Sequence, residues 1–167
     1  MMIDGLQCGH FDRAAFQALL KGGIRGVVNT CGFWEGAVES LDSIARWRDL
    51  VRENADLVEI ATTAEQIEAI AASGRLAIIL GFQNANLFEG RIRFVEFFAE
   101  LGVRVVQLTY NNQNDLAGSC YEAEDSGLAR YGKQVVLEMN RAGILVDCSH
   151  VGNRSTLMAI EASEKPI

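Results

Sequence analysis

Three glycines in this chain occupy the same place in a repeated pattern. Gly74, Gly102 and Gly143 each end a stretch of helical periodicity and directly precede a short apolar run. Glycine often ends a helix because it adopts the left-handed backbone conformation without strain. Apolar runs without alternation are typical of strands that are buried on both faces of a sheet. Strands that are separated by helices run parallel, so the pattern predicts a parallel α/β fold.

The rest of the chain continues this alternation of strands and helices. Asp12 is expected to cap the first helix, and Thr63-Ala64-Glu65-Gln66 is a capping box. Asn153 or Ser155 is expected to cap the last helix. We expect strands over residues 3–7, 26–31, 57–61, 76–81, 103–110 and 144–147, and helices over residues 12–22, 37–51, 63–73, 91–101, 128–142 and 153–163.

Length and topology leave two architectures open. The 167 residues are enough for a globular core. They could close as a complete doubly wound domain, or form about the first five units of a (βα)8 barrel, which typically needs ~250 residues. Because Lys165-Pro166-Ile167 resembles the entry to another strand, we favour an incomplete TIM-type barrel, with residues 1–167 as a single, amino-terminal domain. The strands at Ile3, Val27, Leu76, Val103 and Ile144 would be successive staves of its wall, and its open edges would make the isolated chain associate or aggregate.

Composition argues against several classes of partner. The formal net charge is -7 and no cluster of Lys and Arg exists, which speaks against nucleic acid and anionic membranes. Residues 1–5 lack the features of a signal peptide, and no apolar run approaches the ~18 residues of a membrane span. We therefore expect a cytoplasmic protein. Its four cysteines, Cys8, Cys31, Cys120 and Cys148, are expected to be free thiols.

Chemistry is expected at the carboxyl ends of the strands. Ligands gather there in parallel α/β folds because the loops vary while the strands hold them rigidly. The long polar loop over residues 111–127 falls on this side. His150 is the first candidate for a functional role, although a hydrogen-bonded structural histidine is the simpler explanation. The polar or sulfur-bearing residues at the expected strand ends are Gln7, Cys8, Thr30, Cys31, Gln83, Asn84, Tyr110, Asn111, Asp147, Ser149 and His150.

Other short motifs have simpler explanations. His10-Phe11-Asp12 imitates a metal-binding H-x-D pair, but Asp12 is better explained as a helix cap. A soft metal could use the C-x-H pairs that end at His10 and His150, but such pairs are common. We expect the large aromatic residues to take part in core or helix packing, and they are Trp34, Trp47, Phe94, Phe97 and Phe98. The chain has no G-x-G-x-x-G, Walker or G-x-S-x-G motif, which removes the usual evidence for nucleotide binding and for a serine nucleophile.

Several segments together point to a known family. They are Leu101-Gly102-Val103-Arg104, Gln107-Leu108-Thr109-Tyr110-Asn111, Gly127-Leu128, Glu138-Met139-Asn140-Arg141-Ala142-Gly143 and Val146-Asp147-Cys148-Ser149-His150-Val151, with Ile3-Asp4-Gly5 and Gly81-Phe82-Gln83 extending the match. This set resembles the membrane (renal) dipeptidase family of zinc metallopeptidases. The resemblance implies a (βα)8 barrel of the amidohydrolase kind, a binuclear zinc site, and hydrolysis of dipeptides or related small amides.

The resemblance also implies where the metal ligands should lie. The family's first-strand His and Asp fall on Leu6 and Cys8, and its bridging Glu falls on Gln83. Leu6 cannot bind a metal, and the neutral Gln83 cannot supply the anionic bridge between two dications. Among these positions, only His150 has the same residue type that the family uses as a zinc ligand. We therefore expect one zinc ion at most, held through His150 with Cys8 as a weaker candidate ligand, and no zinc as the alternative.

The same resemblance implies the roles of the remaining site positions. Tyr110 replaces the family's substrate-side His, and Gln83 replaces the bridging Glu, so both are expected at catalytic positions. Asn84 and Asn111 are expected to bind the substrate. Gly5-Leu6-Gln7 and Gly81-Phe82-Gln83-Asn84-Ala85 match a bacterial subgroup of the family, which favours a shared alternative site over random loss.

Three hypotheses follow for the function. The first is a dipeptidase-like hydrolase that acts on a dipeptide, a related small amide or an amine-bearing molecule. The second is a non-catalytic barrel that binds a small molecule at the same place, and zinc content separates these two. The third is a complete doubly wound domain unrelated to peptidases. The first two hypotheses predict a small-molecule partner and no binding to nucleic acid or membranes. Association into a homo-oligomer stays open.

Overall fold

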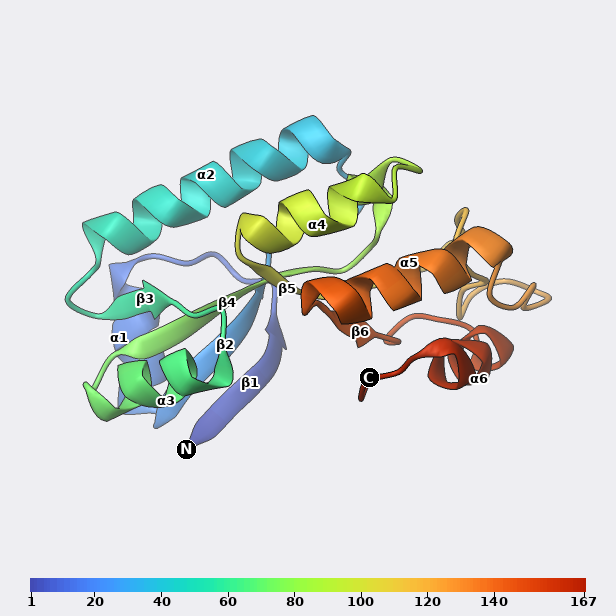
Figure 1. Ribbon diagram of the computed structural model, residues 1–167. Coiled ribbons are helices and arrows are strands. Elements are labelled where there is room, and N and C mark those ends of the chain that lie inside the picture. The colour runs from blue at the N-terminus through green and yellow to red at the C-terminus, as the bar shows by residue number, and fades with distance from the viewer.

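A parallel sheet with helices on both faces forms the protein, and the computed structural model describes residues 1–167 (Figure 1). The strands are β1 (Met2–Gln7), β2 (Ile24–Thr30), β3 (Val58–Ile60), β4 (Leu76–Phe82), β5 (Val103–Gln107) and β6 (Leu145–Asp147). The helices are α1 (Arg13–Lys21), α2 (Ala37–Glu53), α3 (Ala64–Ala72), α4 (Arg93–Glu100), α5 (Arg130–Ala142) and α6 (Asn153–Ala162), with a short 3₁₀ helix η1 (Asn86–Phe88).

The strand order is that of a barrel wall. The path runs β1-β2-β4-β5-β6, and every pairing along it is parallel. β1 lies at the edge, whereas a doubly wound sheet would place it in the middle. The predicted parallel staves and the incomplete TIM-type barrel are therefore confirmed, in the form of a half-barrel. β3 pairs only with the beginning of β4, at Leu76 to Ile78, and does not form a stave of its own.

The position of α3 follows from this strand order. The chain passes from β2 beyond β4 to β3 and then returns to β4. A right-handed crossover that reverses its direction along a sheet places its helix on the opposite face. α3 accordingly packs Ile67 against Ile79 and Ile70 against Ala77, on what we call the inner face of the sheet. Figure 1 shows α3 on the other side of the sheet from α2 and α4.

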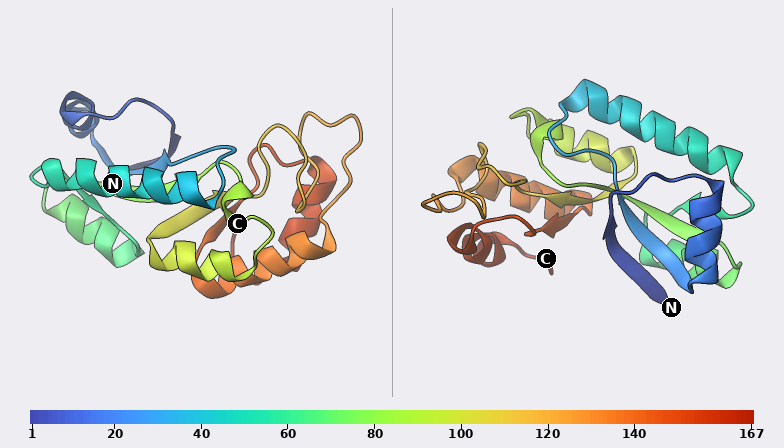
Figure 2. Two further views of the ribbon diagram at one scale, coloured as in Figure 1. Left: turned by 90° about the horizontal axis from the view of Figure 1, so that it is seen from above. Right: turned by 180° about the vertical axis from the view of Figure 1, so that it is seen from behind.

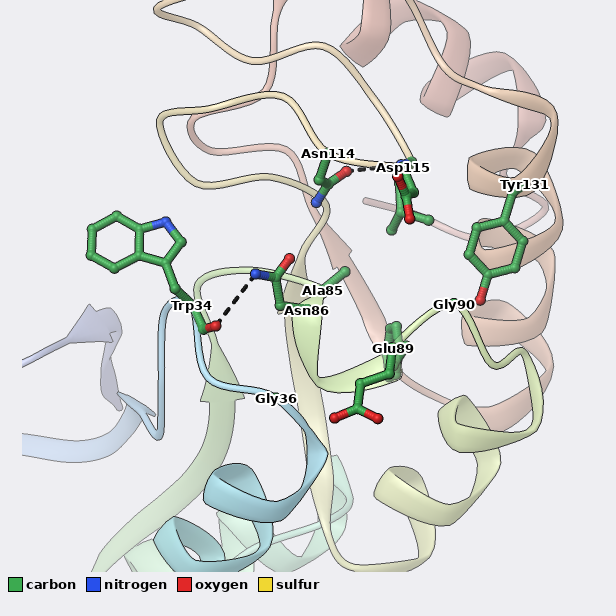
Figure 3. A pocket seen from close by; sticks show the side chains of 11 residues that line it. Trp34, Gly36, Ala85, Asn86, Glu89, Gly90, Asn114, Asp115 and Tyr131 are labelled. Atoms are coloured by element: carbon green, nitrogen blue, oxygen red, sulfur yellow. Dashed lines mark hydrogen bonds between the residues drawn. The ribbon is translucent and has the colours of Figure 1, made fainter.

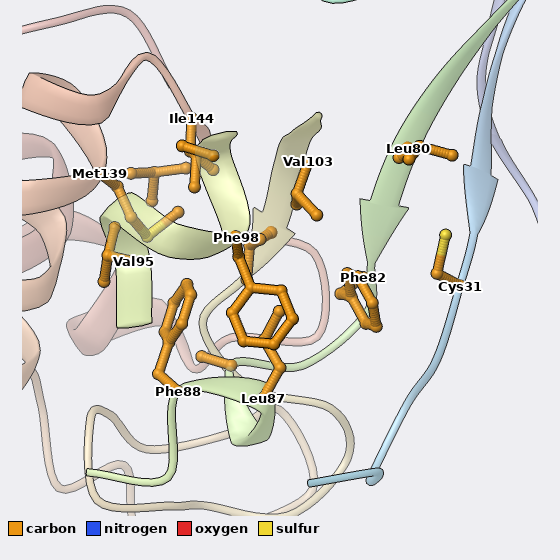
Figure 4. Close-up of a cluster of buried hydrophobic side chains, with 14 of the residues drawn as sticks. Cys31, Leu80, Phe82, Leu87, Phe88, Val95, Phe98, Val103, Met139 and Ile144 are labelled. Atoms are coloured by element: carbon orange, nitrogen blue, oxygen red, sulfur yellow. The ribbon is translucent and has the colours of Figure 1, made fainter. Parts of the chain in front are cut away.

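The outer face of the sheet carries the main hydrophobic core. Ile78, Leu80 and Phe82 of β4 point to this side, where they join buried side chains of the other helices. Phe82 meets Phe98 of α4 with ring centroids 6.2 Å apart, and Figure 4 shows the two rings within the cluster. Burial of each such side chain stabilises the fold by about 1.5–3 kcal/mol. This core fixes the strands and so gives the loops at their carboxyl ends a rigid base.

Two of the predicted helix caps are confirmed. The Asp12 side chain accepts a hydrogen bond from the Ala15 amide at 2.8 Å, and Thr63 accepts one from the Gln66 amide at 3.2 Å. The capping box closes one residue earlier than expected, because the Gln66 side chain accepts from the amide of Thr62.

Two predicted boundaries at the site are wrong. β5 ends at Gln107 and not at residue 110, because the chain turns at Asn111, whose φ is +61°, and Tyr110 pairs with Asn112 within this turn. α5 begins at Arg130, two residues later than expected. The preceding segment is held away from the helix by an antiparallel bridge between Leu128 and Ala117.

The predicted cap of the last helix is also wrong. α6 begins at Asn153 with Gly152 as its N-cap, and neither Asn153 nor Ser155 caps it. Asp125, from the loop between β5 and α5, replaces them by accepting from the Ser155 amide at 2.9 Å and from the Ser155 hydroxyl. Figure 2 shows this loop beside α6. A Cβ atom at Gly152 would lie 2.3 Å from the Asp125 carboxylate, so glycine is required there. The carboxylate thus ties the loop to the helix that follows the candidate site.

Asp125 should make stability depend on pH. Burial alone would raise its pKa, but hydrogen bonds from Ser155, Gly127 and Arg154 outweigh this effect and lower the pKa below its ordinary value. A lowered pKa in the folded state means that the stabilisation is complete above the unfolded value of about 3.9 and is lost as the pH falls through the folded value. In urea unfolding of the full-length protein, Asp125→Asn should cost about 1–3 kcal/mol at pH 7 and less at pH 3.

The control for this prediction is Asp42→Asn. Asp42 forms an exposed ion pair with Arg46 on α2, so its loss should change the unfolding free energy by less than about 1 kcal/mol. An equal loss for Asp125→Asn at both pH values would contradict the proposed role of the carboxylate charge.

Candidate active site

The candidate site lies on the inner face at the carboxyl ends of the strands. Gln83 directly follows β4 and is 4% exposed. Its backbone amide donates to the Gly32 carbonyl at 3.0 Å, and its side-chain amide donates to the Thr30 hydroxyl at 2.7 Å. The ends of β2 and β4 are thereby joined, as their parallel register requires. One N–H of the Gln83 side-chain amide is used in this way, so its second N–H and its carbonyl oxygen are left for a ligand.

His150 is held in an uncommon backbone conformation. Its φ is +62°, in the left-handed region that non-glycine residues rarely adopt. Its carbonyl oxygen accepts three hydrogen bonds, from the Thr109 hydroxyl at 3.1 Å, the Ser119 hydroxyl at 2.8 Å and the Cys120 amide at 3.0 Å. Such a conformation persists only where surrounding contacts fix it, and it occurs preferentially at functional positions.

The His150 ring is positioned by two neighbours from the same loop. Its Nδ1 lies 2.8 Å from the Asn111 side-chain oxygen, and its ring centroid lies 4.5 Å from that of Tyr110. An amide oxygen only accepts, so this pairing places the proton of a neutral imidazole on Nδ1. The Nε2 lone pair then remains for a ligand. The structure therefore brings together Tyr110, Asn111 and His150, which the sequence analysis had selected as candidate site residues.

One aromatic residue at this site was assigned incorrectly from the sequence. Trp34 was expected in the core or in helix packing, but it lies in a loop and is 56% exposed. Trp34 and Phe33, in the loop after β2, pack edge-on against Tyr110 with centroids 5.1 and 5.0 Å away. Their place directly after a strand was the signal that could have identified them.

Asn84 takes part in a network that sequence reasoning missed. It is 4% exposed, and its side-chain oxygen accepts from the Ala85 amide at 2.8 Å and from Asn114 at 3.0 Å. Asn114 also donates to the Leu108 carbonyl at 2.7 Å within the loop after β5, so its hydrogen bond to Asn84 ties this loop to the loop after β4. The carboxamides of Asn84 and Asn114 therefore set the relative positions of two loops at the site.

The fully buried Gln107 was also missed. It lies on the inner face beside Asp147 of β6, and neither polar atom of its side-chain amide has a hydrogen-bond partner. An unpaired buried amide destabilises the folded state by roughly 1–3 kcal/mol, so the site contains a polar group that packing alone does not explain.

The cysteines at the strand ends do not join this group. Cys31 faces the outer core, and burial raises the pKa of its thiol to about 12, which keeps it protonated. Cys8 is exposed beyond β1. The neighbouring Gln7 donates its side-chain amide to Asp4 at 2.7 Å and has no contact with the candidate site in the hydrogen-bond network.

The donor atoms at these strand ends do not fit a two-metal centre. Leu6 packs with Val28, Ile79 and Val105 in an apolar cluster on the inner face. Gln83 is neutral and bound to Thr30. No three His, Cys, Asp or Glu side chains converge anywhere in the chain. Two zinc ions need more anionic and imidazole ligands than these residues supply.

Comparison with known proteins identifies the family. Residues 10–167 match the model of the membrane dipeptidases, peptidase family M19. The chain belongs to this family. An uncharacterized dipeptidase of Schizosaccharomyces pombe is 31% identical over 134 residues, which are 77% of this chain and 32% of that protein. Dipeptidase 3 of Rattus norvegicus is 29% identical over 137 residues, 78% of this chain and 27% of that protein.

Solved structures support the half-barrel assignment. An amidohydrolase from Pseudomonas aeruginosa is 40% identical with a TM-score of 0.97, covering 100% of this chain and 51% of that one. A metallo peptidase from Rhodobacter sphaeroides, liganded with a phosphinate mimic of the dipeptide L-Ala-D-Ala, is 14% identical with a TM-score of 0.82, covering 98% and 62%. At that identity the likeness concerns the fold alone. The chain spans about a third of the length of the curated relatives that it matches.

Membership in the dipeptidase family settles the broad class. The chain resembles dipeptidase-type hydrolases in a family of metallopeptidases, and the prediction of this family from the sequence is confirmed. The hypothesis of an unrelated doubly wound domain is wrong, because both the strand order and the family match exclude it. None of the helices combines the length and the apolar character needed to cross a membrane.

Proposed function

We propose that the protein is a membrane-dipeptidase-like hydrolase for dipeptides or related small amides, with a degraded metal site that holds one zinc ion at most, or none. The observation that carries the proposal is the pair of substitutions at the ligand positions, with Leu6 in an apolar cluster and Gln83 bound to Thr30. In this proposal, residues 1–167 form one domain, the amino-terminal part of the barrel, in a cytoplasmic protein.

The residues at the site then bind and orient a substrate. His150 keeps Nε2 free for a zinc ion or a substrate donor. Cys8 was the weaker candidate ligand from the sequence, but it is exposed beyond β1 and we no longer include it in the site. Tyr110 stands where the family has its substrate-side His, and its hydroxyl can donate a hydrogen bond to a substrate carbonyl. The Gln83 side-chain oxygen can accept from a substrate amide, while Asn84 and Asn111 line the same mouth.

The alternative is a barrel of the same family that binds a small molecule without hydrolysing it. The same Gln83–Thr30 hydrogen bond favours it, because a side chain fixed in this way serves recognition and supplies no bridging anion. Both versions have a small molecule as partner and neither involves nucleic acid or a membrane. Whether copies associate stays a prediction.

Metal analysis of the purified full-length protein, together with dipeptide turnover, tests this proposal. We expect one equivalent of zinc or less and feeble or no hydrolysis of simple dipeptides, because the groups that would activate water between two metals are replaced. Measurable amide turnover that is lost on chelation would favour the hydrolase, whereas ligand binding without turnover would favour the binding barrel. Two tightly held zinc ions with brisk dipeptide hydrolysis would refute both.

A further inference from the structure

Three aromatic side chains form a compact group beside His150, and we call it the aromatic cluster. It consists of Phe33 and Trp34, from the loop after β2, and Tyr110, from the loop after β5. Every pair is in contact, with ring centroids 5.0, 5.1 and 6.0 Å apart. The Tyr110 ring also lies 4.5 Å from the His150 ring, so the aromatic cluster directly adjoins the candidate site.

Trp34 is the exposed member of the aromatic cluster. It is 56% exposed, although large aromatic side chains are usually buried for most of their surface. Figure 3 shows its indole ring pointing away from the side chains of Asn86 and Asn114. The indole therefore presents a large apolar surface next to the candidate site, and a ligand that covers this surface gains the free energy of removing it from water.

Hydrogen bonds and ring contacts hold the Trp34 loop in place. The Phe33 amide donates to the Glu35 carboxylate at 2.5 Å, and the Trp34 carbonyl accepts a longer hydrogen bond, of 3.4 Å, from the Asn86 side chain. Tyr110 supports the indole edge-on, with an angle of 72° between the two ring planes. An aromatic surface that is held in this way loses little conformational entropy when a ligand binds to it.

The geometry of the aromatic cluster favours an apolar ligand group over a cation. A cation that is enclosed by aromatic rings lies within about 6 Å of their centroids, so the rings must stand apart to admit it. Here the rings touch one another, which leaves no space for a cation between them. A cation on the outer face of Trp34 would stay hydrated and gain little, whereas an aromatic group can stack there and displace water.

We propose that the aromatic cluster receives an aromatic side chain of the substrate, with Trp34 as the residue that determines this specificity. The inference rests on the proposed function, in which the candidate site binds a dipeptide or a related small amide. The rings of His150 and Trp34 both contact Tyr110, and consecutive Cα atoms lie about 3.8 Å apart, so a dipeptide whose amide lies at His150 can bring a side chain to Trp34. A dipeptide without a side chain leaves the indole in water.

Calorimetric titration of the full-length protein with glycyl-phenylalanine and glycyl-glycine tests this inference. Glycyl-phenylalanine should bind about tenfold more tightly, because its phenyl ring is partly buried against Trp34. Trp34→Ala should remove this advantage and leave the affinity for glycyl-glycine unchanged, whereas Trp34→Phe should keep most of it. The indole fluorescence of the wild type should also shift to shorter wavelength with glycyl-phenylalanine, and Trp34→Phe should lose this shift.

The matched control is Phe97→Ala. Phe97 is 58% exposed on α4, outside the aromatic cluster, so its loss should leave the preference for glycyl-phenylalanine unchanged. Circular dichroism verifies the folding of each variant, and the fluorescence shift of the wild type provides a test that needs no alanine variant.

Three outcomes would overturn the inference. Equal affinity for the two dipeptides, or a preference that Trp34→Ala does not change, would remove the role of Trp34 and leave the proposed function standing. Tighter binding of glycyl-lysine than of glycyl-phenylalanine would show that the aromatic cluster selects a cation. Binding of neither glycyl-phenylalanine nor glycyl-glycine would overturn both the inference and the proposed function, so the two failures can be told apart.

Discussion

Replacing His150 with alanine is expected to abolish zinc binding by the full-length protein. His150 is the residue at the strand ends that combines a free imidazole nitrogen with a backbone fixed by three hydrogen bonds to its carbonyl. Loss of a direct ligand should weaken zinc affinity at least a hundredfold, which leaves no zinc after dialysis. Inductively coupled plasma mass spectrometry on wild type and variant measures the change.

The chain offers a matched control, since His10 is its other histidine. His10 is exposed and lies outside the His150 network, so His10→Ala should retain the wild-type zinc content. Gln83→Glu alone should not add a second zinc, because Leu6 still occupies another ligand position in an apolar cluster. A second equivalent of zinc in Gln83→Glu, or wild-type zinc in His150→Ala, would show that other residues form the metal site.

The 167-residue chain, expressed alone, is expected to associate or aggregate. β1 and β6 are the edges of its open sheet, and exposed apolar residues lie on them, including Ile3 on β1 and Leu145 on β6, the latter 46% exposed. Unpaired edge strands pair readily with other strands, and exposed apolar patches promote association. Light scattering coupled to size exclusion should show species larger than a monomer at micromolar concentration.

Charge placed on the two edges should reduce this association. The double variant Ile3→Lys and Leu145→Lys introduces lysines that disfavour edge pairing. Val38→Lys is the control, because Val38 is exposed on α2 and away from both edges. A monodisperse wild-type monomer with a cooperative thermal transition would contradict the prediction.

Most of the fold could be predicted because its signals are local. Gly74, Gly102 and Gly143 all adopt positive φ, so the glycines that mark strand entry do so for a backbone reason that the sequence displays. The cap at Asp12 is equally local. The cap of α6 was not predictable in this way, because Asp125 is 30 residues away from Ser155 in the sequence, and such pairing depends on how the loop folds.

The position of the candidate site could be predicted from the sequence, but several of the residues that form it could not. Tyr110, Asn111 and His150 lie together because parallel strands deliver their ends to one place. Trp34 and Asn114 were missed because loop conformation decides whether an aromatic or an amide faces the site or the core. No periodicity marks a residue in an irregular loop.

The inner location of α3 gives the concave side of the half-barrel a floor. Ile67 and Ile70 close the sheet near the start of β4, at the end opposite to His150. We therefore expect a small molecule to reach and to leave the candidate site only at the carboxyl ends of the strands, past Tyr110, because aliphatic side chains fill the opposite end.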